Sequence, residues 1–216
     1  MKEYGVIGLG NFGATVAIEL TSLKCRVTAI DSDKEKVQSM PDGTHQVILA
    51  NATERKFLEQ LGVEKFECFV VSTGEDWHAS ILITMLLKEL GARKIIVKAA
   101  SADHASVLRK VGASQAIIPE KELARRLSHS LARPNMIDYL PLASEYHVAE
   151  LVPPPEFIKK KLLELQLRSK YRVQVLAVKN TATGGHDFVP GGDYEVQSSD
   201  ILIIVGKDED IARLVP

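Results

Sequence analysis

The feature that most constrains the fold is an alternation of short apolar segments with amphipathic segments through the first 132 residues. The segments expected to be strands are 4–8, 26–30, 46–49, 68–71, 95–98 and 115–118. The segments expected to be helices between and after them are 12–23, 34–40, 54–61, 76–90, 103–111 and 120–132. Strands that alternate with helices form a parallel sheet with helices on both faces. The pattern therefore predicts a doubly wound α/β fold of the Rossmann-like class.

The pattern becomes β-rich after residue 134. The segments expected to be strands there are 146–152, 173–179, 187–189 and 201–205, with one main helix over 156–167 and a short one from residue 208. A domain of about 70 residues is near the lower limit for a self-sufficient core, so we expect it to bury a face against a second copy. The predicted organisation is a nucleotide-binding domain at 1–134, a linker at 135–144 and a small α+β domain at 145–216.

Charge and hydropathy exclude several classes of function. Lys and Arg number 27 and Asp and Glu 28, so there is no basic excess to bind nucleic acid or an anionic membrane surface. The longest apolar run, 81–87, is shorter than the roughly 20 residues of a membrane span, and the start of the chain has no signal-peptide pattern. We expect a soluble cytoplasmic protein in which Cys25 and Cys68 are free, buried thiols.

A glycine-rich fingerprint follows the first expected strand. Residues 8–13 read GLGNFG, and Asp31 lies 18 residues after Gly13, at the end of the second strand. In this context Gly8 allows a tight turn, Gly10 lets phosphate approach the backbone and Gly13 lets the helix pack on the sheet. Asp31 would accept hydrogen bonds from ribose hydroxyls and repel a 2′-phosphate. The sequence thus favours adenine nucleotides or NAD over NADP.

Two further strand ends are expected in the same crevice. Residues 50–54 (ANATE) follow the third strand and 72–76 (STGED) follow the fourth, and small and amide side chains suit the edge of an adenine ring. Asn51 or, more readily, Thr53 could instead cap a helix, and 72–74 could be an ordinary turn. The remaining residues predicted to contact the nucleotide are Asn11, Phe12, Ser32, Asn51, Ala52, Thr53, Ser72, Thr73 and Gly74.

The sequence offers no evident catalytic group. A hydride-transfer enzyme needs a substrate pocket and an acid–base residue, but none of the five tyrosines has a lysine four residues later and the histidines lack zinc-site spacing. We expect His78 and His104 to be exposed at helix starts and residues 159–161 (KKK) to lie on the solvated face of a helix. These observations predict a binding protein, with an NAD-dependent oxidoreductase as the alternative.

A series of motifs along the chain resembles the RCK family, the regulatory subunits and domains of potassium transport, and especially its KtrA/TrkA-type subunits. The motifs are VIGLGNFG at 6–13, AIDSD at 29–33, ILANATE at 48–54, VVSTGED at 70–76, IIVKAAS at 95–101, AIIPEKELA at 116–124 and FVPGGDYEVQSSDILIIVG at 188–206. The resemblance implies an RCK N-terminal and an RCK C-terminal domain, with homodimers paired through a crossover helix near 120–131.

The resemblance also implies a role. Family members often close into an octameric ring beneath an integral membrane, potassium-translocating subunit of the KtrB/TrkH type. Such a subunit would be cytoplasmic and peripheral at the inner face of the membrane, through its partner. It would bind ADP, ATP, AMP or NAD(H), and ligand exchange would change the shape of the ring. A nucleotide- or redox-sensing module of a different transporter is the second alternative.

Three positions are interpreted through the resemblance alone. Lys98 falls in a motif near the ligand, and Glu120 matches a glutamate that helps hold a divalent cation, Mg²⁺ or Ca²⁺, at the phosphates between subunits. From the residues alone, Glu120 could equally be an acid that stabilises a helix start. Asn11 stands where KtrA-type subunits commonly carry an arginine for the terminal phosphate of ATP. A charged hydrogen bond contributes about 1.5–3 kcal/mol, so this departure gives ADP, AMP or NAD(H) more weight.

Overall fold

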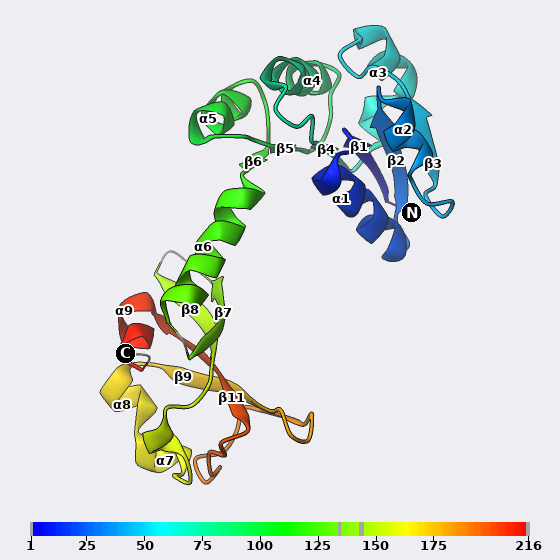
Figure 1. Ribbon diagram of the computed structural model, residues 1–216. Helices are drawn as coiled ribbons and strands as arrows, with labels where there is room; N and C mark the ends of the chain where they lie inside the picture. Colours follow the sequence, from blue (N-terminus) through cyan, green and yellow to red (C-terminus); the bar gives the residue numbers. More distant parts are fainter. Residues whose placement is uncertain (1, 134, 143–144, 215–216) are drawn as a thin grey trace. The chain divides into compact units, whose positions relative to one another are not determined.

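The computed structural model describes residues 2–133, 135–142 and 145–214. The chain divides into two compact units, residues 1–119 and 120–216, which are described separately (Figure 1). This division falls before the helix that the sequence analysis assigns to the first domain. The domain limits at 134 and 145 stay a prediction.

The first unit is built on a six-stranded parallel sheet. Its strands are β1 (Glu3–Ile7), β2 (Arg26–Asp31), β3 (Gln46–Leu49), β4 (Cys68–Val71), β5 (Ile95–Lys98) and β6 (Gln115–Ile117). Their order in the sheet is β3-β2-β1-β4-β5-β6, so the direction of winding reverses between β1 and β4. Such a reversal opens a crevice at the carboxyl ends of the strands. The predicted Rossmann-like class is confirmed.

Helices cover this sheet because its strands are apolar on both faces. They are α1 (Asn11–Ser22), α2 (Lys34–Gln38), α3 (Arg55–Leu61), the 3-10 turn η1 (Val63–Lys65), α4 (Trp77–Glu89) and α5 (Ala102–Lys110). One buried cluster joins Phe69 and Leu87 to α3–α5, and another joins Val6 and Val27 to α1. Burying a side chain of this size contributes about 1.5–3 kcal/mol, so the two apolar layers hold the strand ends in place.

The second unit contains a five-stranded antiparallel sheet in the order β10-β9-β11-β8-β7. Its strands are β7 (Met136–Pro141), β8 (Tyr146–Leu151), β9 (Gln174–Asn180), β10 (His186–Phe188) and β11 (Asp200–Lys207). Its helices are α6 (Pro119–Ala132), which begins at the last residue of the first unit, η2 (Pro155–Phe157), α7 (Leu162–Leu165), α8 (Leu167–Tyr171) and α9 (Asp208–Ala212). Leu151, Leu202 and Ile204 form the centre of its core.

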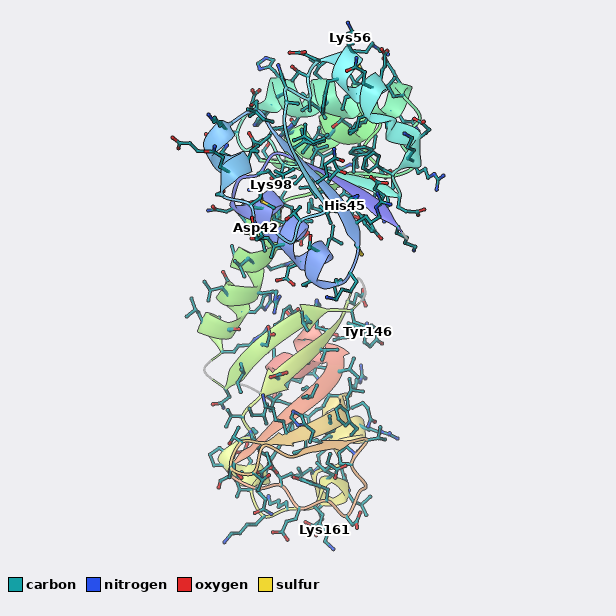
Figure 2. The ribbon with its side chains drawn as sticks, turned by 90° about the vertical axis from the view of Figure 1, so that its right-hand side faces the viewer. Asp42, His45, Lys56, Lys98, Tyr146 and Lys161 are labelled. Atoms are coloured by element: carbon teal, nitrogen blue, oxygen red, sulfur yellow. The ribbon has the colours of Figure 1, made fainter. Side chains whose placement is uncertain are left out.

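The helix predicted over 156–167 is wrong. Lys159 donates its backbone N–H to the carbonyl oxygen of Val196 at 2.8 Å, and Lys161 forms a bridge with Glu195. Lys159 has a left-handed backbone (φ 61°) and Lys161 is extended, so no helix runs through these residues. A second left-handed residue, Gln166 (φ 50°), separates α7 from α8. The three lysines are therefore on no helix, although Lys161 does point into solvent (Figure 2).

Other expectations also need correction. Strand β7 lies inside the segment expected to be a linker, where it pairs antiparallel with β8. Cys68 is buried and Cys25 only partly so, and both thiols are free.

Within the described parts of the chain, no helix is both long and apolar enough to cross a membrane.

Candidate functional site

A cleft of about 230 Å³ opens at the carboxyl ends of β1 to β4, where the sheet order reverses. Ten residues predicted from the sequence line it: Gly8, Gly10, Asp31, Ser32, Asn51, Ala52, Thr53, Ser72, Thr73 and Gly74. The parallel sheet brings together loops that are up to 66 residues apart in the chain, from residue 8 to residue 74.

The glycine loop has little room for side chains at two points. A Cβ on Gly8, where φ is +90°, would lie 2.1 Å from the Ser72 carbonyl oxygen, and one on Gly13 would lie 1.9 Å from the Gly8 carbonyl oxygen. At Gly10, by contrast, no described atom lies within 4 Å of the added Cβ. The loop thus packs tightly against β4 and α1 while its middle stays open for a ligand.

The start of α1 is suited to an anion. Gly10 is its N-cap, and among the described residues no side chain caps the helix and no acid occupies its first turn. The first N–H groups of a helix lack partners within the helix and carry its positive dipole end. A phosphate placed beside Gly10 would accept these hydrogen bonds, as phosphates commonly do at helix starts.

Asp31 is held in a defined position at the end of β2. Its side chain is 8% exposed, its Oδ2 accepts the Leu9 backbone N–H at 2.6 Å, and its Oδ1 accepts that of Asp33 at 2.8 Å. The Lys36 Nζ lies 3.8 Å from the Asp31 Oδ2. Because each carboxylate oxygen has two acceptor positions, Asp31 keeps capacity for ribose hydroxyls.

The loops after β3 and β4 are organised by their own hydrogen bonds. The Asn51 Oδ1 accepts the Thr53 backbone N–H at 3.1 Å and its hydroxyl at 2.7 Å. No described side chain caps α3, whose N-cap is Glu54, so the alternative interpretation of Asn51 or Thr53 as a helix cap is wrong. After β4, the Asp76 Oδ1 accepts the Ala79 N–H at 2.9 Å and caps α4.

The remaining predicted residues lie outside the lining of the cleft. Asn11, Phe12 and Gly13 are in the first turn of α1, and the Lys98 ammonium is 6.0 Å from the centre of the Phe12 ring. Glu120 is counted with the second unit. In the described chain, no group of three or more His, Cys, Asp or Glu side chains is arranged to hold a metal ion. The roles of Lys98 and Glu120 stay predictions.

Sequence reasoning missed part of the lining. The lining residues that it did not identify are Ile7, Ile30, Lys36, Ala79 and Ile83. Ala50 and Asp76 belong to the two segments that it placed in the crevice. Ile7 and Ile30 directly precede predicted residues, so adjacency could have indicated them. Adjacency could not have indicated Lys36, because it reaches the cleft from α2, five residues after Asp31.

His104 is buried, so the expectation that it is exposed is wrong. Its side chain is 1% exposed and stacks on Trp77 with ring centres 4.5 Å apart. Its Nδ1 accepts the Ala100 N–H at 3.2 Å, which leaves the proton of the neutral ring on Nε2, 2.9 Å from the Ser80 hydroxyl. Burial lowers the pKa of His104. His78 is exposed, as expected.

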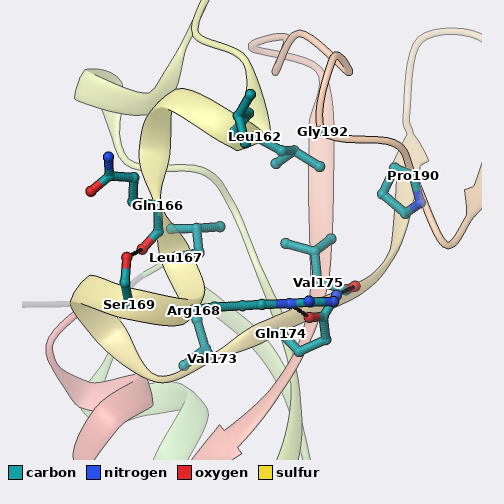
Figure 3. Close-up of a pocket in the computed structure, with 11 residues that line it drawn as sticks. Leu162, Gln166, Leu167, Arg168, Ser169, Val173, Gln174, Val175, Pro190 and Gly192 are labelled. Atoms are coloured by element: carbon teal, nitrogen blue, oxygen red, sulfur yellow. Dashed lines mark hydrogen bonds between the residues drawn. The ribbon is translucent and has the colours of Figure 1, made fainter.

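The second unit has a cavity of its own, of about 420 Å³, that the sequence analysis did not foresee (Figure 3). Five of its eleven lining residues are leucine or valine, from α7, α8 and the start of β9 with the residue before it, and Pro190 and Gly192 close one side. The Arg168 guanidinium donates to the Gln174 side-chain oxygen along this wall. None of the residues predicted to bind a ligand is among the described residues that line it.

Comparison with known proteins identifies the chain's relatives. The TrkA-N domain family matches residues 4–119 and the TrkA-C domain family matches 147–216. The Ktr system potassium uptake protein C of Bacillus subtilis is 35% identical over 214 residues, which cover 98% of this chain and 95% of that protein. The Ktr system potassium uptake protein A of the same organism is 36% identical over 212 residues, with the same coverage.

The chain belongs to the TrkA-N/TrkA-C family. All lining residues of the first cleft fall within the TrkA-N match, and those of the second cavity within the TrkA-C match. Glu120 lies one residue beyond the TrkA-N match.

Solved structures agree on the fold of this TrkA-N/TrkA-C chain. The GsuK channel bound to NAD matches with a TM-score of 0.55 and 20% identity, over 99% of this chain and 38% of the channel chain. The NAD(P)-binding domain of an exopolyphosphatase-related protein from Archaeoglobus fulgidus matches with a TM-score of 0.55 and 23% identity, over 61% of this chain and 98% of that domain.

Proposed function

We propose that the protein is a cytoplasmic regulatory subunit of a potassium uptake system, and that it gates an integral membrane, potassium-translocating partner in response to a bound nucleotide. One observation carries the proposal. A cleft with a glycine loop and an anchored Asp31 occurs in a chain 35–36% identical along its length to Ktr potassium uptake proteins.

The ligand is an adenine nucleotide or NAD(H). Its phosphates would meet the N–H groups at the start of α1, its ribose would meet Asp31, and its base would lie between the Asn51 and Thr73 loops. The neutral amide of Asn11 provides no cation for a terminal phosphate, which favours ADP, AMP or NAD(H) over ATP. Solved structures of the GsuK channel are bound to NAD and to ADP, which supports the same ligand class here.

The proposed assembly is a homodimer that closes into an octameric ring beneath the membrane partner. Leu123, Leu127 and Leu131 on α6 are 65%, 57% and 74% exposed and recur every four residues. Such a stripe covers one side of a helix and suits packing against the same helix of a second copy. In this arrangement Glu120, in the first turn of α6, would help hold Mg²⁺ or Ca²⁺ near the nucleotide phosphates.

The cleft has the features of a binding site rather than of an active site. The titratable residues among its described lining are Asp31, Lys36 and Asp76. Oxygens of both aspartates accept backbone N–H groups, so both side chains help to hold the loops around the cleft. Gating then requires that the nucleotide bind one arrangement of the ring more tightly than the other, by about 10⁴-fold for a near-complete switch.

Potassium uptake tests the proposal. Uptake is measured in a strain that lacks its own regulator and receives this gene, as wild type, as Asp31→Ala or as Asp42→Ala, which removes an exposed acid outside the cleft. We expect wild type and Asp42→Ala to restore nucleotide-dependent uptake and Asp31→Ala to lose the nucleotide response. Uptake that does not change when the gene is present would contradict the proposal.

Two alternatives make different predictions. An oxidoreductase would change absorbance at 340 nm in the presence of a substrate, because NADH absorbs there and NAD does not. A sensor of a different transporter would co-purify with a membrane protein that carries no potassium. The identity to Ktr potassium uptake proteins along 98% of the chain disfavours both.

A further inference from the structure

We infer that Lys36 determines which ribose the cleft accepts, and that it lets the site bind adenine nucleotides that carry a phosphate at the ribose 2′ position. The ligand class then includes NADP(H) as well as NAD(H). This inference rests on the proposed nucleotide site and concerns one end of it, where Asp31 and Lys36 lie together. It changes the expectation from the sequence, in which Asp31 alone would exclude a 2′-phosphate.

The position of Lys36 carries the inference. Its Nζ lies 3.8 Å from the Asp31 Oδ2 and 3.8 Å from the Asp33 Oδ2. Its side chain is 47% exposed and lines the cleft from α2. Among the described lining residues it is the one cation. Since Asp31 marks where the ribose hydroxyls bind, the Lys36 ammonium lies within reach of a substituent on the 2′ oxygen.

The negative charge at this end of the cleft is partly compensated, since the Lys36 ammonium lies beside two carboxylates, Asp31 and Asp33. Backbone N–H groups of Leu9 and Asp33 donate to the two oxygens of Asp31. Asp33 accepts the Glu35 N–H and does not line the cleft. A 2′-phosphate in the cleft would therefore meet one carboxylate, Asp31, together with the exposed Lys36 ammonium. Ser32, which also lines the cleft, adds a hydroxyl donor.

A purely structural role for Lys36 makes a different prediction. A surface ion pair contributes little to folding stability, so removing the ammonium should leave the fold intact. If Lys36 served only to neutralise Asp31, its loss would alter the binding of every nucleotide in the same way. If it contacts a 2′-phosphate, its loss would selectively weaken nucleotides that carry that group.

The test compares two probes that differ only at the 2′ position, 5′-AMP and adenosine 2′,5′-bisphosphate. Binding to the full chain is measured by titration calorimetry for wild type, Lys36→Gln and Lys34→Gln. Lys34 is the matched control, because it is an exposed lysine on the same helix that does not line the cleft. Thermal melting confirms that each variant is folded.

We expect wild type to bind both probes, with affinities within about tenfold of one another. Lys36→Gln should weaken the bisphosphate by about tenfold or more beyond any change in AMP, which corresponds to the loss of one charged hydrogen bond. Lys34→Gln should change neither. Equal effects of Lys36→Gln on both probes, or none, would overturn the inference while the nucleotide site stands. Wild type that binds neither probe would overturn the nucleotide site itself.

Discussion

Asp31 in the first unit and Asp200 in the second are both buried carboxylates, and they serve different purposes. Asp31, 8% exposed, accepts two backbone N–H groups and still lines an open cleft. Asp200, 1% exposed, accepts from the Asn180 amide, the Tyr194 hydroxyl and the Gln197 backbone N–H. Asp200 is satisfied within the protein, whereas Asp31 keeps acceptor capacity toward the cleft.

The two cavities differ in the same way. The larger one, in the second unit, has mostly apolar walls and arises where α7, α8 and β9 meet. The smaller one lies where strand ends, a helix start and a carboxylate converge. The size of a cavity therefore does not identify the nucleotide site. The polar groups that remain available to a ligand identify it.

The largest predicted effect is the loss of stability caused by a substitution in the glycine loop, residues 8–13. Gly13→Ala puts a methyl group against the Gly8 carbonyl oxygen, so α1 must shift, and we expect the free energy of unfolding to fall by about 2–3 kcal/mol. Gly10→Ala meets no described atom within 4 Å and should cost less, yet it should weaken nucleotide binding because its methyl group occupies the phosphate approach. Denaturant unfolding and calorimetry measure the two effects. Equal stability of the two variants would contradict the packing role of Gly13.

Asp200→Asn should have an intermediate effect, on stability and not on nucleotide binding. The substitution replaces a carboxylate that accepts three hydrogen bonds with an amide. We expect the free energy of unfolding to fall by about 1–3 kcal/mol, because a buried donor loses its acceptor. Asp187→Asn, at an exposed acid on β10, is the control. Loss of nucleotide affinity in Asp200→Asn would break the distinction between the two carboxylates.

Asp200→Asn also has a spectroscopic signature. Burial and the hydrogen bond to Asp200 raise the pKa of Tyr194 to about 12. A raised pKa in the folded state stabilises the fold below pH 10, and that contribution is lost as the pH rises through about 12. In Asp200→Asn we expect one tyrosine to ionise at a lower pH than in wild type, seen as tyrosinate absorbance in an alkaline titration. An unchanged titration would contradict the role of this hydrogen bond.

The smallest effect is the pH dependence that His104 confers on the first unit. Burial lowers its pKa in the folded state, so the unfolded chain binds a proton more readily. Stability is full above an unfolded pKa of about 6.5 and is lost as the pH falls below it, with a slope of at most about 1.4 kcal/mol per pH unit. Unfolding followed by the fluorescence of Trp77, the single tryptophan, measures this slope.

His104→Gln should flatten that slope, and His78→Gln, at an exposed histidine on α4, should leave it unchanged. An equal slope in His104→Gln and wild type between about pH 7 and 5 would show that His104 does not carry the pH dependence.

Much of the first unit could be predicted because local and tertiary signals agree there. The strands at 46–49, 68–71 and 95–98 are short apolar runs between turn signals, and the structure has the same bounds. A parallel sheet with the GxGxxG loop and a following acid leaves few places for the cleft, so ten of its lining residues were identified without coordinates.

The second unit was harder to predict because distant pairings decide its backbone. Residues 156–167 have helical spacing, but hydrogen bonds to residues 195–196 hold part of them extended. No local signal marks Lys159 as left-handed (φ 61°). The same holds for the burial of His104, because its contacts with Ser80 and Trp77 depend on how α5 packs against α4.

The most direct test of the account is calorimetric binding of ADP, ATP, AMP, NAD and NADH to the wild-type chain and to Asp31→Asn, with and without magnesium. The account predicts that wild type binds ADP, AMP or NAD(H) at least as well as ATP, because Asn11 carries no charge. It also predicts that Asp31→Asn weakens them all, since each ribose would lose a charged acceptor. Nucleotide affinity that is unaffected by Asp31→Asn would contradict the assignment of the cleft.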